Sequence, residues 1–208
     1  MKSAVSGPAY CIHTRRLVLR CWQPEDAPLL KAAIDESLDH LRPWMPWAHQ
    51  EPTDIEAKVA LLRRFRGKFD LGKDFVYGVF SRDEGQVLGG TGLHKRLGEG
   101  AREIGYWIHQ EHIGHGLATE LTTALTKVAF KVDKVERVEI HCDPENHASA
   151  AVARKSGFVH KRTMRKEAAD DGAPVYEMIW VMHVDAYPAS PAEEAVVEAF
   201  DAIGRRLL

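Results

Sequence analysis

The chain has 208 residues, of which 45% are hydrophobic and 28% are charged, and its formal net charge is −2. These values are typical of a globular, enzyme-sized chain with enough residues to bury a core in one domain. Acidic and basic residues are interspersed, which argues against a general binder of nucleic acid or of anionic membranes.

Targeting and redox signals are weak. Residues 1–20 lack the apolar core of a signal peptide, and no apolar run approaches transmembrane length. Cys11, Cys21 and Cys142 show neither metal-binding nor redox spacing. We therefore expect a reducing, cytoplasmic environment.

The N-terminal third predicts one strand and two helices. Residues 15–21 alternate as a strand does, and residues 24–41 repeat apolar side chains at helical spacing. Pro43 and Pro46 exclude a helix over residues 42–49. A second helix is expected to begin at Thr53, with Glu56 completing a capping box. Its predicted apolar face comprises Ile55, Val59, Leu62 and Phe69.

The middle of the chain predicts a mixed sheet with helices on both faces. Strands are expected at residues 74–80, 86–97 and 102–109, the last two joined as a hairpin by Gly98-Glu-Gly100. The helix after Gly116 should bury Leu117, Leu121, Leu125 and Val128. There follow a strand at 135–141, a helix at 147–156 ended by Gly157, and strands at 158–165 and 175–184 around a turn at 170–172.

The C-terminal residues predict an extension to this domain. Residues 188–191 are expected to form a linker, so the division is a core domain of residues 1–187 and an amphipathic helical extension of residues 188–208. The extension packs on its own domain, forms a homodimer contact or covers the active site. Its predicted apolar face comprises Ala195, Val196, Ala199, Phe200, Ile203 and Leu207.

The segment 105–119 carries the strongest functional signal. It consists of an apolar strand, a polar turn and a Gly-x-Gly at the start of a helix. Gly114 and Gly116 allow several backbone N–H groups to converge, and the helix start adds unsatisfied N–H groups and a positive dipole end. This arrangement predicts a phosphate site. Thr119 replaces the third glycine of the dinucleotide fingerprint, and the P-loop Gly-Lys-Ser/Thr is absent.

A second motif lies downstream, where Asn146-x-x-Ser149 is followed by Lys155-x-Gly157-Phe158. It resembles motif B of the GNAT superfamily of acyl-CoA-dependent N-acetyltransferases. The glycine turn resembles motif A of the same superfamily, which holds the pyrophosphate of coenzyme A.

The N-terminal segments 14–20 and 26–27 resemble the opening of the RimJ/RimL-type branch, and the whole resemblance covers residues 12–184. It implies an α/β (α+β) fold with a mixed, mostly antiparallel sheet. It also implies transfer of an acetyl group from acetyl-CoA to a primary amine.

Three positions depart from the superfamily pattern. Glu111 stands where Gln or Arg is preferred, and His115 lies between the glycines where Arg is frequent. Backbone N–H groups hold the phosphate, so these two changes have little consequence. Ala153 stands where many members carry a Tyr near the departing CoA thiolate. The usual general acid is therefore absent from that position.

The resemblance implies that strand 102–109 opens from strand 135–141. Exposed backbone groups of the first strand would then pair with the pantetheine arm, and one N–H would polarise the thioester carbonyl. The predicted coenzyme-binding residues are Trp107, Ile108, His109, Gly114, His115, Gly116, Leu117, Ala118, Thr119, Asn146 and Ser149.

Candidate acid and base residues lie in the same two segments. We expect Ser149 to protonate the departing thiolate, with Asn146 capping the helix or reaching into the cleft. Glu103 shares a strand face with Gly105 and Trp107, with Tyr106 on the opposite face, so Glu103 is the predicted base, acting through water. The competing interpretation is an ion-paired Glu103, with His94 or His49 as the base.

The acceptor pocket is predicted to use Trp44 and Trp47, which with Met45 form apolar walls stiffened by two prolines, together with His94. A weakly defined base favours an α-amine, whose pKa of about 7.7–8.0 leaves it partly neutral, over a lysine amine near 10.4. The histidines at 109, 112 and 115 lack a fourth ligand, so no metal is expected.

The predicted reaction is direct attack in a ternary complex, because no cysteine lies in a motif that would hold the acyl group. The acceptor is a protein N-terminal α-amine or a small amine, and a homodimer is possible; nucleic acid and membrane are not expected partners. The alternatives are another donor such as succinyl-CoA and a non-catalytic acyl-CoA-binding regulatory module.

Overall fold

The computed structural model describes residues 7–166 and 175–208. Within these residues nine strands form one sheet in the order β7-β8-β6-β5-β4-β3-β2-β1-β9. Neighbouring strands are antiparallel except β5 and β6, which are parallel. The predicted α/β class with a mixed, mostly antiparallel sheet is therefore confirmed.

The strands are β1 (Cys11–His13), β2 (Leu17–Cys21), β3 (Phe75–Ser81), β4 (Val87–His94), β5 (Ala101–Ile108), β6 (Arg137–Cys142), β7 (Val159–Lys166), β8 (Val175–His183) and β9 (Glu198–Phe200). The α-helices are α1 (Ala27–Leu41), α2 (Ile55–Asp70), α3 (Leu117–Lys131), α4 (His147–Lys155) and α5 (Pro191–Glu194). Short 3-10 turns are η1 (Pro24–Asp26), η2 (Pro46–Gln50), η3 (Gln110–His112) and η4 (Tyr187–Ala189).

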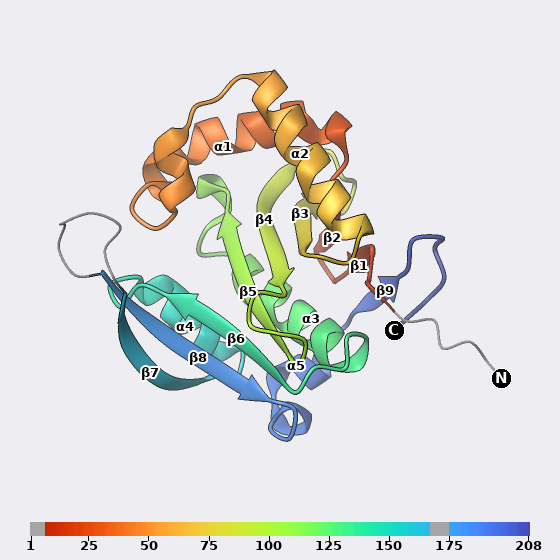
Figure 1. Cartoon of the computed structure of the whole chain (residues 1–208), viewed down its shortest axis with the longest axis vertical. Coiled ribbons are helices and arrows are strands. Elements are labelled where there is room, and N and C mark those ends of the chain that lie inside the picture. The colour runs from red at the N-terminus through yellow and green to blue at the C-terminus, as the bar shows by residue number, and fades with distance from the viewer. Residues whose placement is uncertain (1–6, 167–174) are drawn as a thin grey trace.

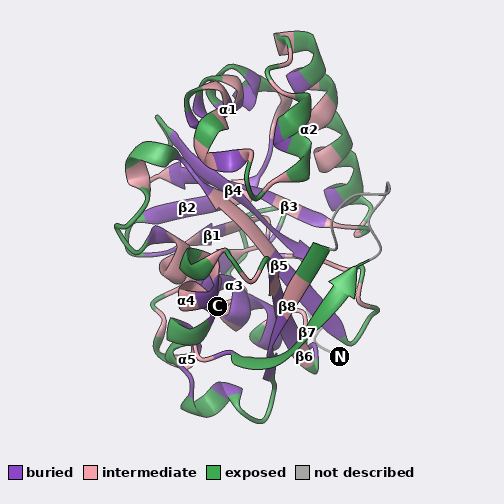
Figure 2. Cartoon of the chain, turned by 90° about the vertical axis from the view of Figure 1, so that its left-hand side faces the viewer, coloured by how far each residue is buried: buried purple, intermediate pink, exposed green. Residues whose placement is uncertain are grey.

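Helices cover both faces of the sheet, with α1 and α2 on one side and α3 and α4 on the other (Figure 1). Strand alternation explains the two cores. Val18 packs among α1 and α2, whereas its neighbours Leu17 and Leu19 lie in the core that contains α3. Figure 2 shows the central strands buried between the helix layers and the edge strand β7 exposed along its length.

The four helices predicted before Gly157 form, with one correction at a helix start. α3 buries Leu117, Leu121, Leu125 and Val128 as expected. The second helix is capped by Asp54, whose carboxylate accepts a hydrogen bond from the Ala57 N–H at 2.8 Å. Thr53 instead donates its hydroxyl to Glu51, so the predicted capping box between Thr53 and Glu56 is wrong. A carboxylate one residue closer to the free N–H groups caps this helix.

The predicted C-terminal amphipathic helix of residues 188–208 is wrong. The only α-helix there is the short α5, and residues 198–200 form β9, which pairs with β1. Ala199 is fully buried, whereas Val196 and Ile203 are 66% and 74% exposed, so the apolar residues do not share one face. The free backbone edge of β1 is satisfied by a strand, and the segment is an integral part of the sheet.

The predicted turn at residues 170–172 lies outside the described residues. Among the helices of the described segments, none has the length and apolar character needed to cross a membrane.

Candidate active site

The parallel strands β5 and β6 separate part of the way along their length. Their pairing is confined to Ala101–Glu103 opposite Arg137–Glu139, and beyond this point β5 pairs only with β4 and β6 only with β8. Figure 1 shows the two strands diverging from that end. The predicted opening between these strands is confirmed, and it leaves an unpaired edge on β5.

The direction of the backbone groups on β5 identifies which residues face the gap. His109 donates its N–H to the Leu88 carbonyl at 2.9 Å, and the Gly105 carbonyl accepts from Thr91 on β4. Because these groups alternate along a strand, the backbone of Tyr106 and Ile108 faces the opening. The prediction that the His109 backbone is free for the coenzyme is wrong. The backbone groups of Trp107 point toward β4, as those of His109 do. Of the three predicted residues, Trp107, Ile108 and His109, only Ile108 has backbone groups that face the gap.

The glycine turn leads from η3 into α3 and has the features of a phosphate site. Gly114 and Gly116 have φ angles of +77° and +78°, and Gly116 is the N-cap of α3 without any side-chain cap. In the part of the chain that the structure describes, no backbone N–H of residues 114–119 donates to a protein acceptor. Six consecutive N–H donors at a helix start favour an anion.

Two side chains join α4 to the opening. Asn146 caps α4 by accepting the Ser149 N–H at 3.0 Å, and Ser149 Oγ lies 3.0 Å from the Tyr106 hydroxyl. Burial raises the pKa of Tyr106 to about 12, so its phenol is protonated at neutral pH. Ala153 is fully buried one turn later and offers no acid.

Tyr106 lies on the strand face opposite Glu103, as predicted, and it is a site residue for which the sequence predicts no role. That face is the one covered by α3 and α4, where Ser149 lies. The alternation of side chains along the strand could have identified Tyr106. The helix that carries Ser149 must pack on one of the two faces of the sheet, and Tyr106 is on one of them.

Glu103 is buried and engaged in a charged network rather than free. Arg96 binds both of its oxygens, with Nε to Oε2 at 2.6 Å. Burial alone would raise the pKa of Glu103, but the Arg96 guanidinium and the nearby His141 hold it below its usual range. His141 in turn contacts Glu139 at 2.8 Å and Glu177 at 3.2 Å. A carboxylate bound in this way is a weak base.

His94 has the geometry of an oriented imidazole. Its Nδ1 lies 3.1 Å from both oxygens of Asp74, and its Nε2 lies 3.3 Å from the position of a Cβ on Gly105. A carboxylate that accepts Nδ1–H leaves Nε2 as a proton acceptor beside β5. Burial would raise the pKa of Asp74, but its hydrogen bond with His94 lowers it, so the pair is maintained at neutral pH.

Of the predicted tryptophan walls, one lies against the strand. The Trp47 ring packs edge-on to Trp107, with centroids 6.2 Å apart. Trp107 itself lies across Gly90, where a Cβ would come within 2.5 Å of Nε1. Trp44 and Trp47 are each 36% exposed, but Trp44 makes no aromatic contact among the described residues. His49 in η2 is exposed and has no side-chain hydrogen bond in residues 7–166 and 175–208.

The cysteines are protonated at neutral pH. Burial raises the pKa of Cys11 to about 11 and that of Cys21 to about 12, and it also raises the pKa of Cys142. A thiol that remains protonated is a poor nucleophile, which disfavours a covalent acyl intermediate on cysteine.

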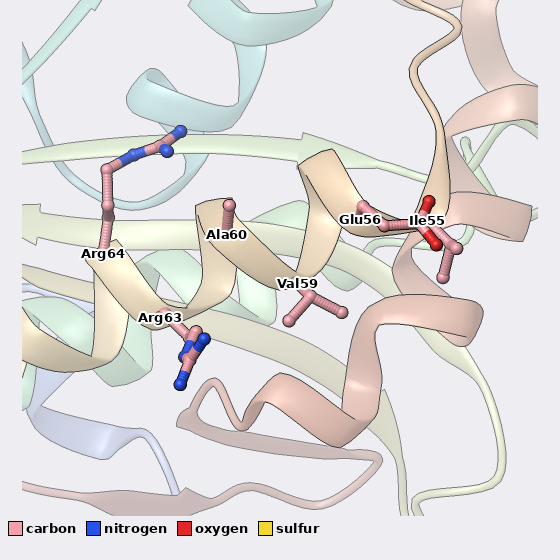
Figure 3. Close-up of a pocket in the computed structure, with 6 residues that line it drawn as sticks. All are labelled: Ile55, Glu56, Val59, Ala60, Arg63 and Arg64. Atoms are coloured by element: carbon pink, nitrogen blue, oxygen red, sulfur yellow. The ribbon is translucent and has the colours of Figure 1, made fainter.

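No group of three or more His, Cys, Asp or Glu side chains among the described residues is arranged to hold a metal ion. A surface hollow on α2 is lined by Ile55, Glu56, Val59, Ala60, Arg63 and Arg64 (Figure 3). One helix supplies all its residues and none belongs to the groups above, so the hollow is separate from the opened strand edge.

Comparison with known proteins identifies the family of the chain. The model of the acetyltransferase (GNAT) domain family matches residues 16–159. The chain is 28% identical to the ribosomal protein uS5-alanine N-acetyltransferase of Escherichia coli (strain K12) over 156 residues, 73% of this chain and 79% of that enzyme. It is 30% identical to the uncharacterized N-acetyltransferase YnaD of Bacillus subtilis (strain 168), over 74% of this chain and 86% of YnaD.

Solved structures share the fold. RimL, a ribosomal L7/L12 alpha-N-protein acetyltransferase in complex with coenzyme A, aligns with a TM-score of 0.73 at 21% identity, over 83% of this chain and 97% of that one. Mycobacterium smegmatis RimJ in complex with CoA-disulfide aligns with a TM-score of 0.71 at 21% identity, over 88% and 91%. The chain belongs to the GNAT family and is an acetyl-CoA-dependent N-acetyltransferase.

Proposed function

We propose that this enzyme acetylates the α-amino group of a protein N-terminus by direct attack in a ternary complex. The observation that carries the proposal is the placement of two polar pairs about the open edge of β5. His94 with Asp74 lies on the face of Glu103, whereas Tyr106 with Ser149 lies on the opposite face. A proton acceptor and a proton donor are thus available on the two sides of one strand.

The glycine turn supplies the coenzyme half of the site. The free N–H groups of residues 114–119 would hold the pyrophosphate, and the backbone of Tyr106 and Ile108 would pair with the pantetheine arm. An N–H on this edge would polarise the thioester carbonyl as charge develops on its oxygen. The reacting carbonyl would then lie in the opening between the two polar pairs.

In the reaction, the amine nitrogen forms a bond to the thioester carbon and the carbon–sulfur bond breaks. His94 Nε2 accepts the proton that the amine loses. Ser149 donates a proton to the leaving sulfur, and Tyr106 replaces that proton across the 3.0 Å contact. Solvent then returns a proton to the Tyr106 phenolate and removes the proton from His94, which restores both groups. Glu103 is the weaker candidate for the base, because Arg96 binds both of its carboxylate oxygens.

An α-amine suits this base better than a lysine does. An α-amine with a pKa of about 7.7–8.0 is partly neutral at neutral pH, whereas deprotonating a lysine amine near 10.4 costs about 4–5 kcal/mol. The named relatives support a protein acceptor, since they are an alanine N-acetyltransferase for uS5 and an alpha-N-acetyltransferase for L7/L12. Trp47 and Trp107 would contact the first residues of the acceptor chain.

We propose neither nucleic acid nor a membrane as a partner of this enzyme. The net charge of −2 favours neither nucleic acid nor an anionic membrane as a partner. A homodimer contact is one role predicted for a C-terminal helix. Because that segment instead forms β9 in the sheet of its own chain, this reason to expect a dimer no longer holds.

The test is release of free CoA thiol from acetyl-CoA with a panel of acceptors. The panel contains peptides with different N-terminal residues, the same peptides with a blocked α-amine, and small amines. We expect release with free N-terminal peptides and none with their blocked forms. Thiol release with small amines alone would contradict the proposal. Equal release with peptides whose α-amine is blocked but whose lysine side chain is free would also contradict it.

A further inference from the structure

One peptide in the phosphate-binding turn is fixed from outside the motif. The His115 carbonyl accepts a hydrogen bond from Arg16 Nη1 at 2.8 Å, although Arg16 lies far away in sequence, just before β2. The peptide unit is planar and trans, so its C=O and N–H point in opposite directions. Binding the His115 carbonyl therefore directs the Gly116 N–H away from Arg16.

Arg16 is itself held by the helix that the turn begins. Its Nε lies 2.6 Å from Glu120 Oε2 and its backbone N lies 2.8 Å from Oε1. The Thr14 hydroxyl donates to the same Oε1 at 2.6 Å. Glu120 is in the first turn of α3, so the turn, the helix start and the β1–β2 connection form one hydrogen-bonded unit.

The arrangement matters because the peptide between His115 and Gly116 has two accessible orientations. Gly116 has φ +78°, and a glycine adopts positive and negative φ with similar ease. With the peptide reversed, the carbonyl oxygen would face the phosphate site and the N–H would be lost to it. A carbonyl lone pair facing a phosphate is repulsive, so reversal would weaken coenzyme binding.

Charge supports the same role. Glu120 places a carboxylate close to a site for an anionic group, and Arg16 neutralises it. Arg16 Nη2 lies 3.6 Å from the position of a Cβ on Gly116, so the guanidinium borders the turn.

We propose that Arg16 is a positioning residue for acetyl-CoA, which holds the His115–Gly116 peptide in the orientation that presents the Gly116 N–H to the pyrophosphate. The proposal rests on the coenzyme half of the proposed function and is independent of the acceptor. Glu120 acts with Arg16 by fixing the guanidinium.

The test compares Arg16→Met with Arg15→Met. Each variant removes one positive charge, from adjacent residues. The Arg15 side chain is exposed and has no hydrogen bond among the described residues, so Arg15→Met is a matched control. For Arg16→Met we expect the Kd of CoA and the KM of acetyl-CoA to rise about tenfold, with kcat changed less than about twofold. Arg15→Met should stay close to wild type in all three values.

Two further variants separate geometry from charge. Arg16→Lys keeps the charge but cannot make the same set of contacts, and the double variant Arg16→Met with Glu120→Gln removes both charges. We expect neither to restore CoA affinity. Restoration by the double variant would show that Arg16 acts only by cancelling Glu120.

A direct readout is the amide NMR signal of Gly116, which should shift in Arg16→Met without coenzyme and stay in place in Arg15→Met. If Arg16→Met fails to fold, Arg16→Lys takes its place in the comparison with Arg15→Met. Equal CoA affinity in the Arg16 and Arg15 variants would overturn the proposal. Failure of the wild type to bind CoA would instead overturn the coenzyme site itself.

Discussion

The Tyr106 hydroxyl lies 3.0 Å from Ser149 Oγ and so joins the open edge of β5 to the first turn of α4. Ser149 is fixed from its other side, because its N–H donates to Asn146. Burial raises the pKa of Tyr106 to about 12, which leaves a proton on the phenol across the physiological range. This pair offers a proton route to the leaving thiolate in a chain whose α4 has the fully buried Ala153 one turn after Ser149 and no Tyr.

Removing either hydroxyl should slow the chemical step. We expect Ser149→Ala to lower kcat about 100-fold and Tyr106→Phe to lower it about tenfold, with the double variant close to Ser149→Ala because the two groups act in series. The measurement is the initial rate of thiol release at saturating substrates. Tyr176→Phe, an exposed tyrosine on β8, is the control. Unchanged turnover in Ser149→Ala would refute the route.

His94 should be the base. We expect His94→Ala to lower kcat/KM for the acceptor about 100-fold at neutral pH, and the deficit to narrow as pH rises above the acceptor pKa, where the amine is already neutral. His49→Ala should match wild type because His49 is exposed and has no side-chain hydrogen bond among the described residues. Measuring pH–rate profiles of both variants and of Glu103→Gln decides between the candidates. A larger loss in Glu103→Gln than in His94→Ala would return the role to Glu103.

The ion pairs of Glu103 should stabilise the fold at neutral pH and lose this effect in acid. The pKa of Glu103 in the folded chain lies below its ordinary value despite burial, because Arg96 and His141 favour the carboxylate. Its contribution is therefore present above the unfolded pKa of about 4.3 and is lost as pH falls through the lower folded value. We expect Glu103→Gln to cost about 1–3 kcal/mol at neutral pH and progressively less below about pH 4.

Urea denaturation of Glu103→Gln and wild type across this pH range checks the expectation. Glu56→Gln, at an exposed position of α2, is the control and should change the free energy of unfolding little. A difference between Glu103→Gln and wild type that stays constant down to low pH would show that the ion pair is not the cause.

The C-terminal strand should be required for stability. Ala199 on β9 pairs with Ile12 of β1 and is fully buried, whereas Val196 is 66% exposed. We expect Ala199→Asp to destabilise the fold by about 3 kcal/mol or more, because it buries an unpaired charge, and Val196→Asp to change it by under about 0.5 kcal/mol. Thermal unfolding of the two variants tests this. Equal melting temperatures would support a detached extension.

The sequence predicts most of the fold because its helices and central strands follow clear periodicities. α3 buries the four predicted side chains, and β5 and β6 open where the motif resemblance implies. The failures lie at the sheet edge. β1 and β9 are three residues long, too short to show a period, and form because each satisfies the other's backbone.

The site residues were only partly predictable for a related reason. Motif spacing identifies the glycine turn and the Asn146-to-Ser149 pair, which are local in sequence. Tyr106, Asp74 and Arg16 act through contacts with residues far away in the chain, so strand parity and register decide their roles. Glu103 lies on the expected face of its strand. Its ion pair with Arg96, however, depends on the conformation of the β4–β5 hairpin, which the sequence pattern does not specify.

The preference for an α-amine is best measured on one peptide that carries both a free α-amine and an internal lysine. It is incubated with enzyme and acetyl-CoA at neutral pH, and mass spectrometric fragmentation then locates the acetyl group. We expect acetylation on the N-terminal residue alone, with loss of this product in His94→Ala. Acetylation of the lysine side chain at a comparable rate would contradict this expectation.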